Sequence, residues 1–348
     1  MGVAPRKGLP GVWASARQVE VVEKLVVWWT WLAFLVLIGV LLAFDLGVFH
    51  RKAHVVQAKE ALAWTGVWIG LALLFNVFIY FGYQYHWLGM DLPFSEPDGQ
   101  TAAVAFFTGY LLEKSLSVDN IFIIAVIFGY FAVPAQYQHR LLFWGILAAL
   151  VMRGVMIVVG VALIEEFHWI LYGFGAILIV TAVRMLLAKH DEGIKENRLM
   201  RLVRKVFPVT DDYEGSRFIV VRDGKRWLTP LALALIAVES ADLVLALDSI
   251  PAIFSVTEDP FLIFTSNVFA ILGLRSLYFA LAHLMGRLPY LKYSLAAILA
   301  LIGAKMLFKD VLHGVPGLMY YTLGAIVLLL AAGVIPSLLR TKAGAKAG

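Results

Sequence analysis

Acidic side chains lie inside segments of this chain that are apolar enough to cross a lipid bilayer. Glu113 and Asp119 stand six residues apart in one such segment, and Asp242 and Asp248 repeat that spacing in another. An ionised carboxylate at the centre of a membrane helix costs about 3 kcal/mol even on the milder insertion scale, and residues kept there usually serve a function. These acids are therefore the first candidates for a functional site.

The composition identifies the class of protein. Of 348 residues, 61% are hydrophobic and 15% are charged, against about 25% charged in an average globular domain. A membrane-spanning helix needs about 20 mainly apolar residues. The sequence therefore predicts an all-α, polytopic membrane protein with nine transmembrane helices, at roughly 25–49, 61–82, 102–128, 140–163, 167–188, 229–255, 261–285, 291–309 and 317–339.

The distribution of lysine and arginine predicts the orientation. The loop 189–228 carries ten basic residues, and cytoplasmic loops carry an excess of such residues. We therefore expect a multi-pass inner-membrane protein with residues 1–24 on the extracytoplasmic side and the C-terminus on the cytoplasmic side. The net charge of +5 then reflects contact with the anionic inner leaflet of the lipid bilayer rather than a nucleic-acid partner. The absence of cysteine excludes disulfides and thiol chemistry.

Two parts of the chain resemble each other. Residues 172–185 (YGFGAILIVTAVRM) align with 293–306 (YSLAAILALIGAKM) at a constant offset of 121, and Arg153 aligns with Arg275 at 122. The two carboxylate pairs align at 129. A unit of three helices ends on the opposite side of the membrane, so two consecutive copies are inverted, as in many transporters. We expect the repeats at 101–188 and 229–312, after two helices in 25–82 and before a last helix at 317–339.

The repeat predicts how the acids meet. Glu113 and the pair Glu239 and Asp242 each lie about half a span from the predicted start of their helix, so antiparallel copies bring them to one depth. Residues six apart on an ideal helix point ~120° away from each other, so one ligand can touch both members of a pair only if the helix bends or unwinds. Pro251 predicts such a break, which would free the carbonyl of Leu247 beside Asp248.

The available donors predict a hard cation. Carboxylate and amide oxygens, without cysteine and without histidine in mid-span, favour Mn²⁺, Mg²⁺ or Ca²⁺ over Zn²⁺ or Cu⁺. Asp45, Asn76 and Asn267 are further oxygen donors in neighbouring spans. Two alternatives remain open for the acids. Glu113 is next to Lys114, and Arg153 and Arg275 could pair with any of the acids, so the acids could form a purely structural network of buried ion pairs. Glu239 could instead carry a proton.

Three motifs resemble the signature segments of the TerC family. They are EKSLSVDN at 113–120, ESADLVLALDSIPA at 239–252 and NVFAILGLR at 267–275. The resemblance, which runs from about residue 25 to residue 339, implies a bacterial inner-membrane protein of the LysE transporter superfamily, a family named for tellurite resistance with members linked to Mn²⁺ export. It points to an acidic cluster with Asp45 as an addition: Glu113, Asp119, Asn120, Glu239, Asp242 and Asp248. Because tellurite is an anion, such a cluster would repel it.

These observations favour a secondary transporter that exports Mn²⁺ or a related divalent ion, with protons as the coupling ion. Neutralising Asp248 is then expected to abolish export. The sequence contains no nucleophile elbow, phosphate loop or metalloprotease signature, so an enzyme is not expected. Two other functions stay open. One is a membrane scaffold or assembly factor that supports secretion or metallation partners without flux of its own, and the other is an amino-acid exporter.

Overall fold

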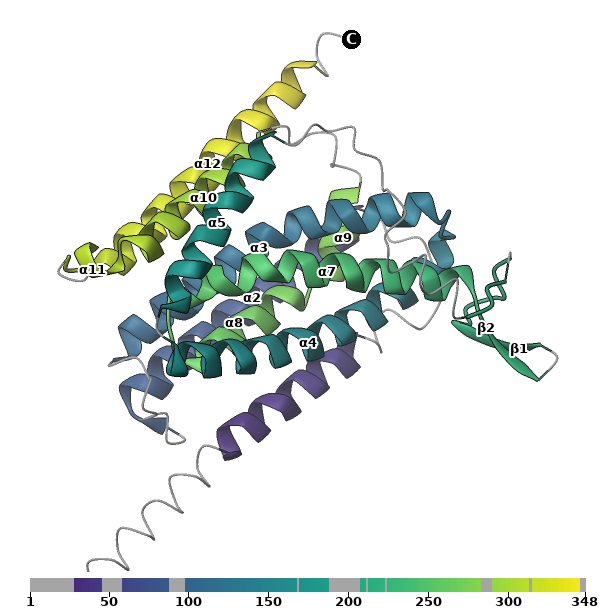
Figure 1. Ribbon diagram of the computed structural model, residues 1–348, viewed down its shortest axis with the longest axis horizontal. Helices are drawn as coiled ribbons and strands as arrows, with labels where there is room; N and C mark the ends of the chain where they lie inside the picture. The colour runs from purple at the N-terminus through teal and green to yellow at the C-terminus, as the bar shows by residue number, and fades with distance from the viewer. Residues whose placement is uncertain are drawn as a thin grey trace, which may run out of the picture.

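The computed structural model is almost entirely helical (Figure 1). It describes residues 28–45, 58–87, 98–167, 169–187, 207–210, 212–222, 224–282, 290–312 and 315–344. The predicted outer segment 1–24 and the first part of the predicted loop 189–228 lie outside these residues. The predicted class, an all-α membrane protein, is confirmed in its main feature.

The helices follow the predicted apolar stretches. The first described helix is Trp28–Asp45. It is followed by α2 (Ala58–Gln84), α3 (Gly99–Tyr130), α4 (Ala135–Glu166), α5 (Ile170–Leu187), α7 (Pro230–Phe254), α8 (Pro260–Ile271), α9 (Leu274–Ala282), α10 (Leu291–Leu307), α11 (Lys309–Leu312) and α12 (Leu318–Gly344).

Seven segments in the described part of the chain are long and apolar enough to cross a membrane. They are the first helix, α2, α4, α5, α7, the region 260–280 that contains α8 and most of α9, and α12. Two helices in predicted spans fall outside these seven. α3 carries Glu113, Lys114 and Asp119 in its middle, and α10 has only 17 residues. The structure thus supports seven of the nine predicted spans by length and composition.

Polar residues at the helix starts fix where the central helices begin. The Asp98 side chain accepts a hydrogen bond from the backbone N–H of Thr101 (2.8 Å) at the start of α3. Asp259 accepts bonds from two backbone N–H groups in the first turn of α8. Thr229 precedes α7, whose first residue is Pro230. Such caps satisfy N–H groups that have no partner within the helix, and proline fits the first helical position.

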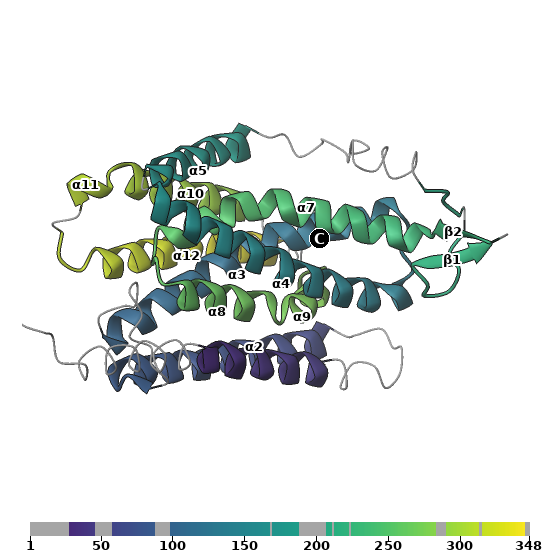
Figure 2. The same cartoon turned by 60° about the horizontal axis from the view of Figure 1, so that its bottom comes forward.

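The helices form two packed groups (Figures 1 and 2). In the first group, α3 contacts α2, α7 and α8, while α4 contacts α7 and α8. In the second, α10 packs against both α5 and α12, and these three run side by side at a steep angle to α4 and α7 (Figure 1). The first group brings the middles of α3, α4, α7 and α8 together, and these four helices carry the candidate site.

Aromatic packing holds the first group together. Phe75 of α2 lies against Phe106 of α3 and Phe269 of α8, with ring centroids 5.5 Å and 4.6 Å apart. All three rings are buried. Aromatic pairs at these separations contribute roughly 0.5–1.5 kcal/mol beyond the burial of their area. By contrast, α4 exposes Val151, Val155 and Val158 on its outer face, as expected of a helix that faces lipid.

The break in a spanning helix does not lie where the sequence predicts it. α7 continues through Pro251 to Phe254, so the expected unwinding beside Asp248 is wrong. The region 260–280 is interrupted instead, because α8 ends at Ile271 and α9 begins at Leu274. Between them Gly273 has a φ of +75°, a conformation that glycine adopts without strain. A Cβ at this position would also stand 2.7 Å from the Trp68 side chain.

A small hairpin lies at one end of the helices. Strands β1 (Ile219–Arg222) and β2 (Lys225–Leu228) pair antiparallel, with Ile219 opposite Leu228. Between the strands, Gly224 has a φ of +72°. The hairpin lies within the predicted loop 189–228. Nearby, Tyr213 donates a hydrogen bond to the Phe131 carbonyl (2.7 Å), and burial raises the pKa of this tyrosine.

Candidate cation site

Arg153 is the centre of the polar cluster between the helices. It lies in the middle of α4, and its side chain is only 2% exposed. Its guanidinium forms ion pairs with Glu113 of α3 and Asp242 of α7. One cation is thus shared by two carboxylates from different helices, which are the first acids of the two predicted pairs.

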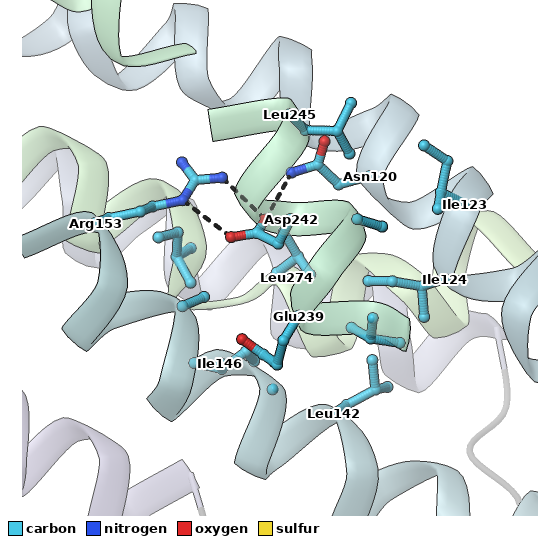
Figure 3. A pocket seen from close by; sticks show the side chains of 15 residues that line it. Asn120, Ile123, Ile124, Leu142, Ile146, Arg153, Glu239, Asp242, Leu245 and Leu274 are labelled. Carbon is cyan, nitrogen blue, oxygen red and sulfur yellow. Dashed lines mark hydrogen bonds and ion pairs between the residues drawn. The ribbon is translucent and has the colours of Figure 1, made fainter. Parts of the chain in front are cut away.

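Asp242 is held by three donors. The Arg153 Nη2 and Nε atoms lie 3.1 Å and 3.4 Å from its two carboxylate oxygens, which gives the forked geometry that arginine favours. The Asn120 side chain of α3 donates to Asp242 Oδ1 at 3.2 Å (Figure 3). The carboxylate keeps 16% of its surface exposed, so it faces open space as well as its partners.

Glu113 is buried more deeply, with 2% of its side chain exposed. Besides its contact with Arg153, it accepts a hydrogen bond from the Asn267 side-chain amide of α8 at 3.3 Å. The Asn267 carbonyl oxygen in turn lies 3.4 Å from Arg153 Nη1. Two carboxylates and one amide, from α3, α7 and α8, therefore contact one guanidinium from α4.

A cavity of about 30 Å³ opens beside this cluster. Arg153, Asp242 and Asn120 line it together with Glu239, which lies one turn before Asp242 on α7 (Figure 3). The Glu239 Oε1 atom is buried and has no hydrogen-bond partner among the described residues. A cavity needs about 10–15 Å³ by this measure to hold one water molecule, so this one has room for a small, partly hydrated ion.

Glycine makes room for Glu239. A Cβ at Gly145 of α4 would stand 3.3 Å from Glu239 Oε1, which is tighter than ordinary side-chain contacts. The rest of the cavity wall is apolar, with residues such as Ile124, Leu142 and Ile146. Charge in such surroundings is weakly screened, so each ionic contact there is stronger than in water.

The helix break borders the same cavity. Ile271 and Leu274, which flank the break between α8 and α9, both line it. Lys114, the residue after Glu113, donates to the backbone carbonyl of Ala270 at 3.1 Å. Irregular backbone at membrane depth is tolerated where it lies against protein or lines a cavity. The structure shows both conditions here.

Two predicted site residues, Asp248 and Asp45, have partners outside this cluster, and the side chain of a third, Asp119, is not described. Asp248 accepts a hydrogen bond from Thr181 of α5 at 2.7 Å, and Asp45 pairs with Arg275 at 2.6 Å. Asp119 lies on α3, but its side chain is outside the described part of the structure. Because α7 is continuous, its two aspartates keep the ~120° separation of an ideal helix and face different neighbours. The remaining predicted residues, Glu113, Asn120, Glu239 and Asp242, come together.

In this conformation the acids are neutralised by arginine rather than arranged as a metal shell. Within the described ranges, no three acidic or histidine side chains lie close enough to hold a metal ion by themselves. The cluster and its cavity contain three carboxylates, Glu113, Glu239 and Asp242, against two cations, the Arg153 guanidinium and the Lys114 ammonium. Hydrogen-bonded oxygen donors with an excess of negative charge suit a small cation, provided that Arg153 moves.

Sequence reasoning missed two members of the site, Gly145 beside Glu239 and Gly273 at the helix break. Both are single glycines in apolar segments, and such glycines mark close packing or a break. Lys114, next to Glu113, was expected only as a possible ion-pair partner of the acids. The contacts that each makes depend on tertiary packing and cannot be read from spacing alone.

The fold and the buried ionic cluster define this chain as a multi-pass integral membrane protein. It belongs to the TerC family, because the family model "Integral membrane protein TerC family" matches residues 98–345. The resemblance seen in the sequence motifs is thereby confirmed.

Relatives extend this result beyond the matched segment. The chain is 46% identical over 343 residues to an uncharacterized membrane protein of Myxococcus xanthus, with 98% of this chain and 96% of the relative covered. It is 47% identical over 285 residues to a protein of Escherichia coli named "Putative membrane-bound redox modulator Alx", covering 81% and 87%. An uncharacterized membrane protein of Rickettsia bellii is 40% identical over 312 residues, covering 89% and 97%. No solved structure matches the chain.

Proposed function

We propose that this protein is a secondary transporter that exports Mn²⁺ or a related divalent cation through the Arg153 cluster, with protons as the coupling ion. The observation that carries the proposal is the convergence of Glu113, Asp242 and two amide side chains from three helices beside a cavity. Acidic residues in membrane-spanning helices are costly to bury, so those that are present usually serve a function. The TerC membership of the chain agrees with this role.

The donor set favours Mn²⁺ over softer metals. The cluster offers carboxylate and amide oxygens, and the sequence contains no cysteine. Such ligands suit Mn²⁺, Mg²⁺ and Ca²⁺, whereas thiolates select Zn²⁺ or Cu⁺. We take three further acidic residues as positions on the ion's route: Asp119 of α3, Asp248 of α7 and Asp45 of the first helix.

The proposed topology places nine spans in an inner membrane, with the N-terminus outside and the C-terminus inside. α3 to α5 and α7 to α10 would be the two inverted repeats, and alternating access would move them relative to each other. The contact between α5 and α10, the last helices of the two units, supports this arrangement. A Cβ at Gly175 would meet the Gly303 carbonyl at 3.0 Å, and a Cβ at Gly303 would meet the Gly175 carbonyl at 2.8 Å. This reciprocity is expected of two helices related by a two-fold axis.

The name of the Escherichia coli relative suggests a redox role, which bears on this chain only indirectly. With no cysteine in 348 residues, this protein has no thiol with which to exchange disulfides. A redox effect would therefore have to follow from what the protein transports or from another partner. A membrane scaffold without flux is the alternative from another class, and a flux measurement separates it from a transporter.

The test is metal flux in proteoliposomes that contain the purified full chain and an entrapped Mn²⁺-sensitive dye, with and without a pH gradient. We expect saturable Mn²⁺ flux that the gradient drives. Asp242→Asn should lower it by about tenfold or more, since it removes an oxygen ligand at the centre of the cluster. Asp310→Asn is the matched control, because Asp310 of α11 is exposed and bonds to Tyr172. Absence of flux from the unmodified chain would contradict the proposal and favour a scaffold.

A further inference from the structure

Arg153 occupies the position that a transported cation would need. Its guanidinium contacts Glu113 Oε1, Asp242 Oδ1 and Oδ2, and Asn267 Oδ1. These four oxygens come from three helices, α3, α7 and α8. Carboxylate and amide oxygens are also the ligands that a hard divalent ion takes. The side chain therefore fills a shell of oxygen donors as well as neutralising it.

We propose that Arg153 is a tethered counter-ion, which holds the cation position in this conformation and which the substrate ion must displace. The inference rests on the proposed function for the identity of that ion. The same oxygens cannot serve the guanidinium and a divalent cation at once, and two cations at this distance would repel each other strongly in apolar surroundings. Entry of the ion and departure of Arg153 are thus one coupled exchange.

Glu239 supplies the place to which Arg153 moves. Both residues line the same cavity, and Glu239 Oε1 is buried there without a hydrogen-bond partner among the described residues. Arg153 lies C-terminal to Gly145, the α4 residue next to Glu239, and side chains on a helix lean toward its N-terminus. A displaced guanidinium therefore meets a carboxylate instead of becoming an unpaired buried charge, which would be strongly unfavourable.

This exchange explains why the cluster holds three acids around one arginine. With Arg153 on Glu113 and Asp242, Glu239 faces the cavity alone. With a divalent ion on those two carboxylates, Arg153 pairs with Glu239, and the displaced guanidinium again has a carboxylate partner. The arginine thereby resets the empty site and prevents the ion from being held too tightly to leave.

The test is equilibrium Mn²⁺ binding, measured by electron paramagnetic resonance on the full chain in lipid nanodiscs. A protein whose binding-competent state is only partly populated binds more weakly by that fraction. Arg153→Gln removes the competitor, so it should bind Mn²⁺ about tenfold or more tighter than the unmodified chain, while flux falls because release is slow. Arg140→Gln is the matched control. It removes an arginine from the same helix, where Arg140 bonds to Ser216 outside the cavity.

Glu239→Gln provides an independent readout through a double-mutant cycle. In the unmodified background it should weaken Mn²⁺ binding, because displaced Arg153 loses its acceptor. In the Arg153→Gln background it should change binding by less than about twofold, since no guanidinium remains to be accepted. Equal weakening in both backgrounds would mean that Glu239 is a direct ligand and would overturn the exchange.

Other outcomes are equally decisive. If Arg153 were only a structural brace, Arg153→Gln would bind Mn²⁺ no tighter than the unmodified chain, and the inference would fail while the proposed function could still hold. If this variant does not fold, Arg153→Lys replaces it in the test. A compact ammonium cannot bridge both carboxylates as the forked guanidinium does, so the Arg153→Lys protein should also bind Mn²⁺ more tightly than the unmodified chain. Flux absent from the unmodified chain, with tight binding by Arg153→Gln, would overturn the proposed function alone.

Discussion

Two arginines occupy equivalent places in the repeated sequence, yet they have different surroundings. Arg153 and Arg275 are each 2% exposed and pair with buried carboxylates. Arg275 contacts Asp45 twice, with Nη2 2.6 Å from the Asp45 carboxylate and 2.9 Å from the Asp45 backbone carbonyl. Arg153 instead holds acids on two different helices and lines a cavity.

We infer from this difference that a second carboxylate and adjacent space, rather than the ion pair itself, suit Arg153 to a role in ion binding. Arg275 fastens the end of the first helix to α9 by side-chain and backbone contacts, an arrangement suited to a fixed anchor. Arg153 has alternative carboxylates and adjacent space, so it can exchange partners. Removing one member of a buried pair typically costs about 3–5 kcal/mol. We expect the loss of Arg275 to lower the stability of the protein and the loss of Arg153 to change its ion binding.

The largest effect is expected when the anchor is broken. Arg275→Met removes the ion pair to Asp45, whose side chain is 11% exposed, and should lower the free energy of unfolding by about 3–5 kcal/mol. Thermal unfolding in detergent measures this loss. The double variant Arg275→Met with Asp45→Leu should recover most of it. If Arg275→Met remained as stable as the unmodified chain and bound Mn²⁺ more tightly, the contrast between the two arginines would be wrong.

Filling the cavity should affect transport with less effect on stability. Gly145→Val places methyl groups next to Glu239 in a cavity of about 30 Å³. Mn²⁺ flux in proteoliposomes should fall by about tenfold or more, because the ion and the moving guanidinium lose their space. Gly173→Val is the control, since a Cβ at Gly173 of α5 meets nothing within 4 Å. Equal flux from both variants would mean that the cavity is not on the route.

A smaller and more selective effect is expected at Asp248. The sequence predicts that its neutralisation abolishes export, whereas the structure pairs it with Thr181 and not with the cluster. Asp248→Asn keeps a hydrogen-bonding side chain and should lower flux while it leaves equilibrium Mn²⁺ binding within about twofold of the unmodified chain. Binding that is lost together with flux would place Asp248 in the primary site.

The smallest effect comes from an acid outside the cluster and serves as a baseline. Asp98→Ala removes the cap of α3 and should lower the free energy of unfolding by about 1 kcal/mol at pH 7. The hydrogen bond from the Thr101 backbone N–H holds the pKa of Asp98 below its ordinary value of 3.8. This contribution is therefore fully present above that value and is lost as the pH falls through the lower, folded-state pKa. Unfolding curves at neutral and acidic pH should show the difference shrink.

The sequence predicted where the helices lie better than the contacts between their side chains. Apolar runs indicated the helices, because a bilayer forces every spanning segment to be long and apolar. The constant offsets pointed to Glu113 and Asp242 as equivalent acids, and both contact Arg153. The structure thus brings these two sequence-equivalent acids to one cation.

The remainder depended on packing that spacing does not encode. Pro251 lies inside a continuous helix, whereas the break occurs at Gly273, where the Trp68 side chain leaves no room for a Cβ. Likewise, nothing in the sequence distinguishes Arg153 from Arg275, since both are mid-span arginines at matching positions. Only the tertiary contacts show that one has two acidic partners and a cavity while the other has Asp45.

The most direct test of the account compares Mn²⁺ binding by two variants that each remove one buried acid. Asp242→Asn and Asp45→Asn carry the same chemical change, one beside Arg153 and the other beside Arg275. Titration of purified protein in nanodiscs should show that Asp242→Asn loses Mn²⁺ affinity by about tenfold or more, while folded Asp45→Asn binds like the unmodified chain. Equal affinities for the two variants would contradict a cation site at Arg153.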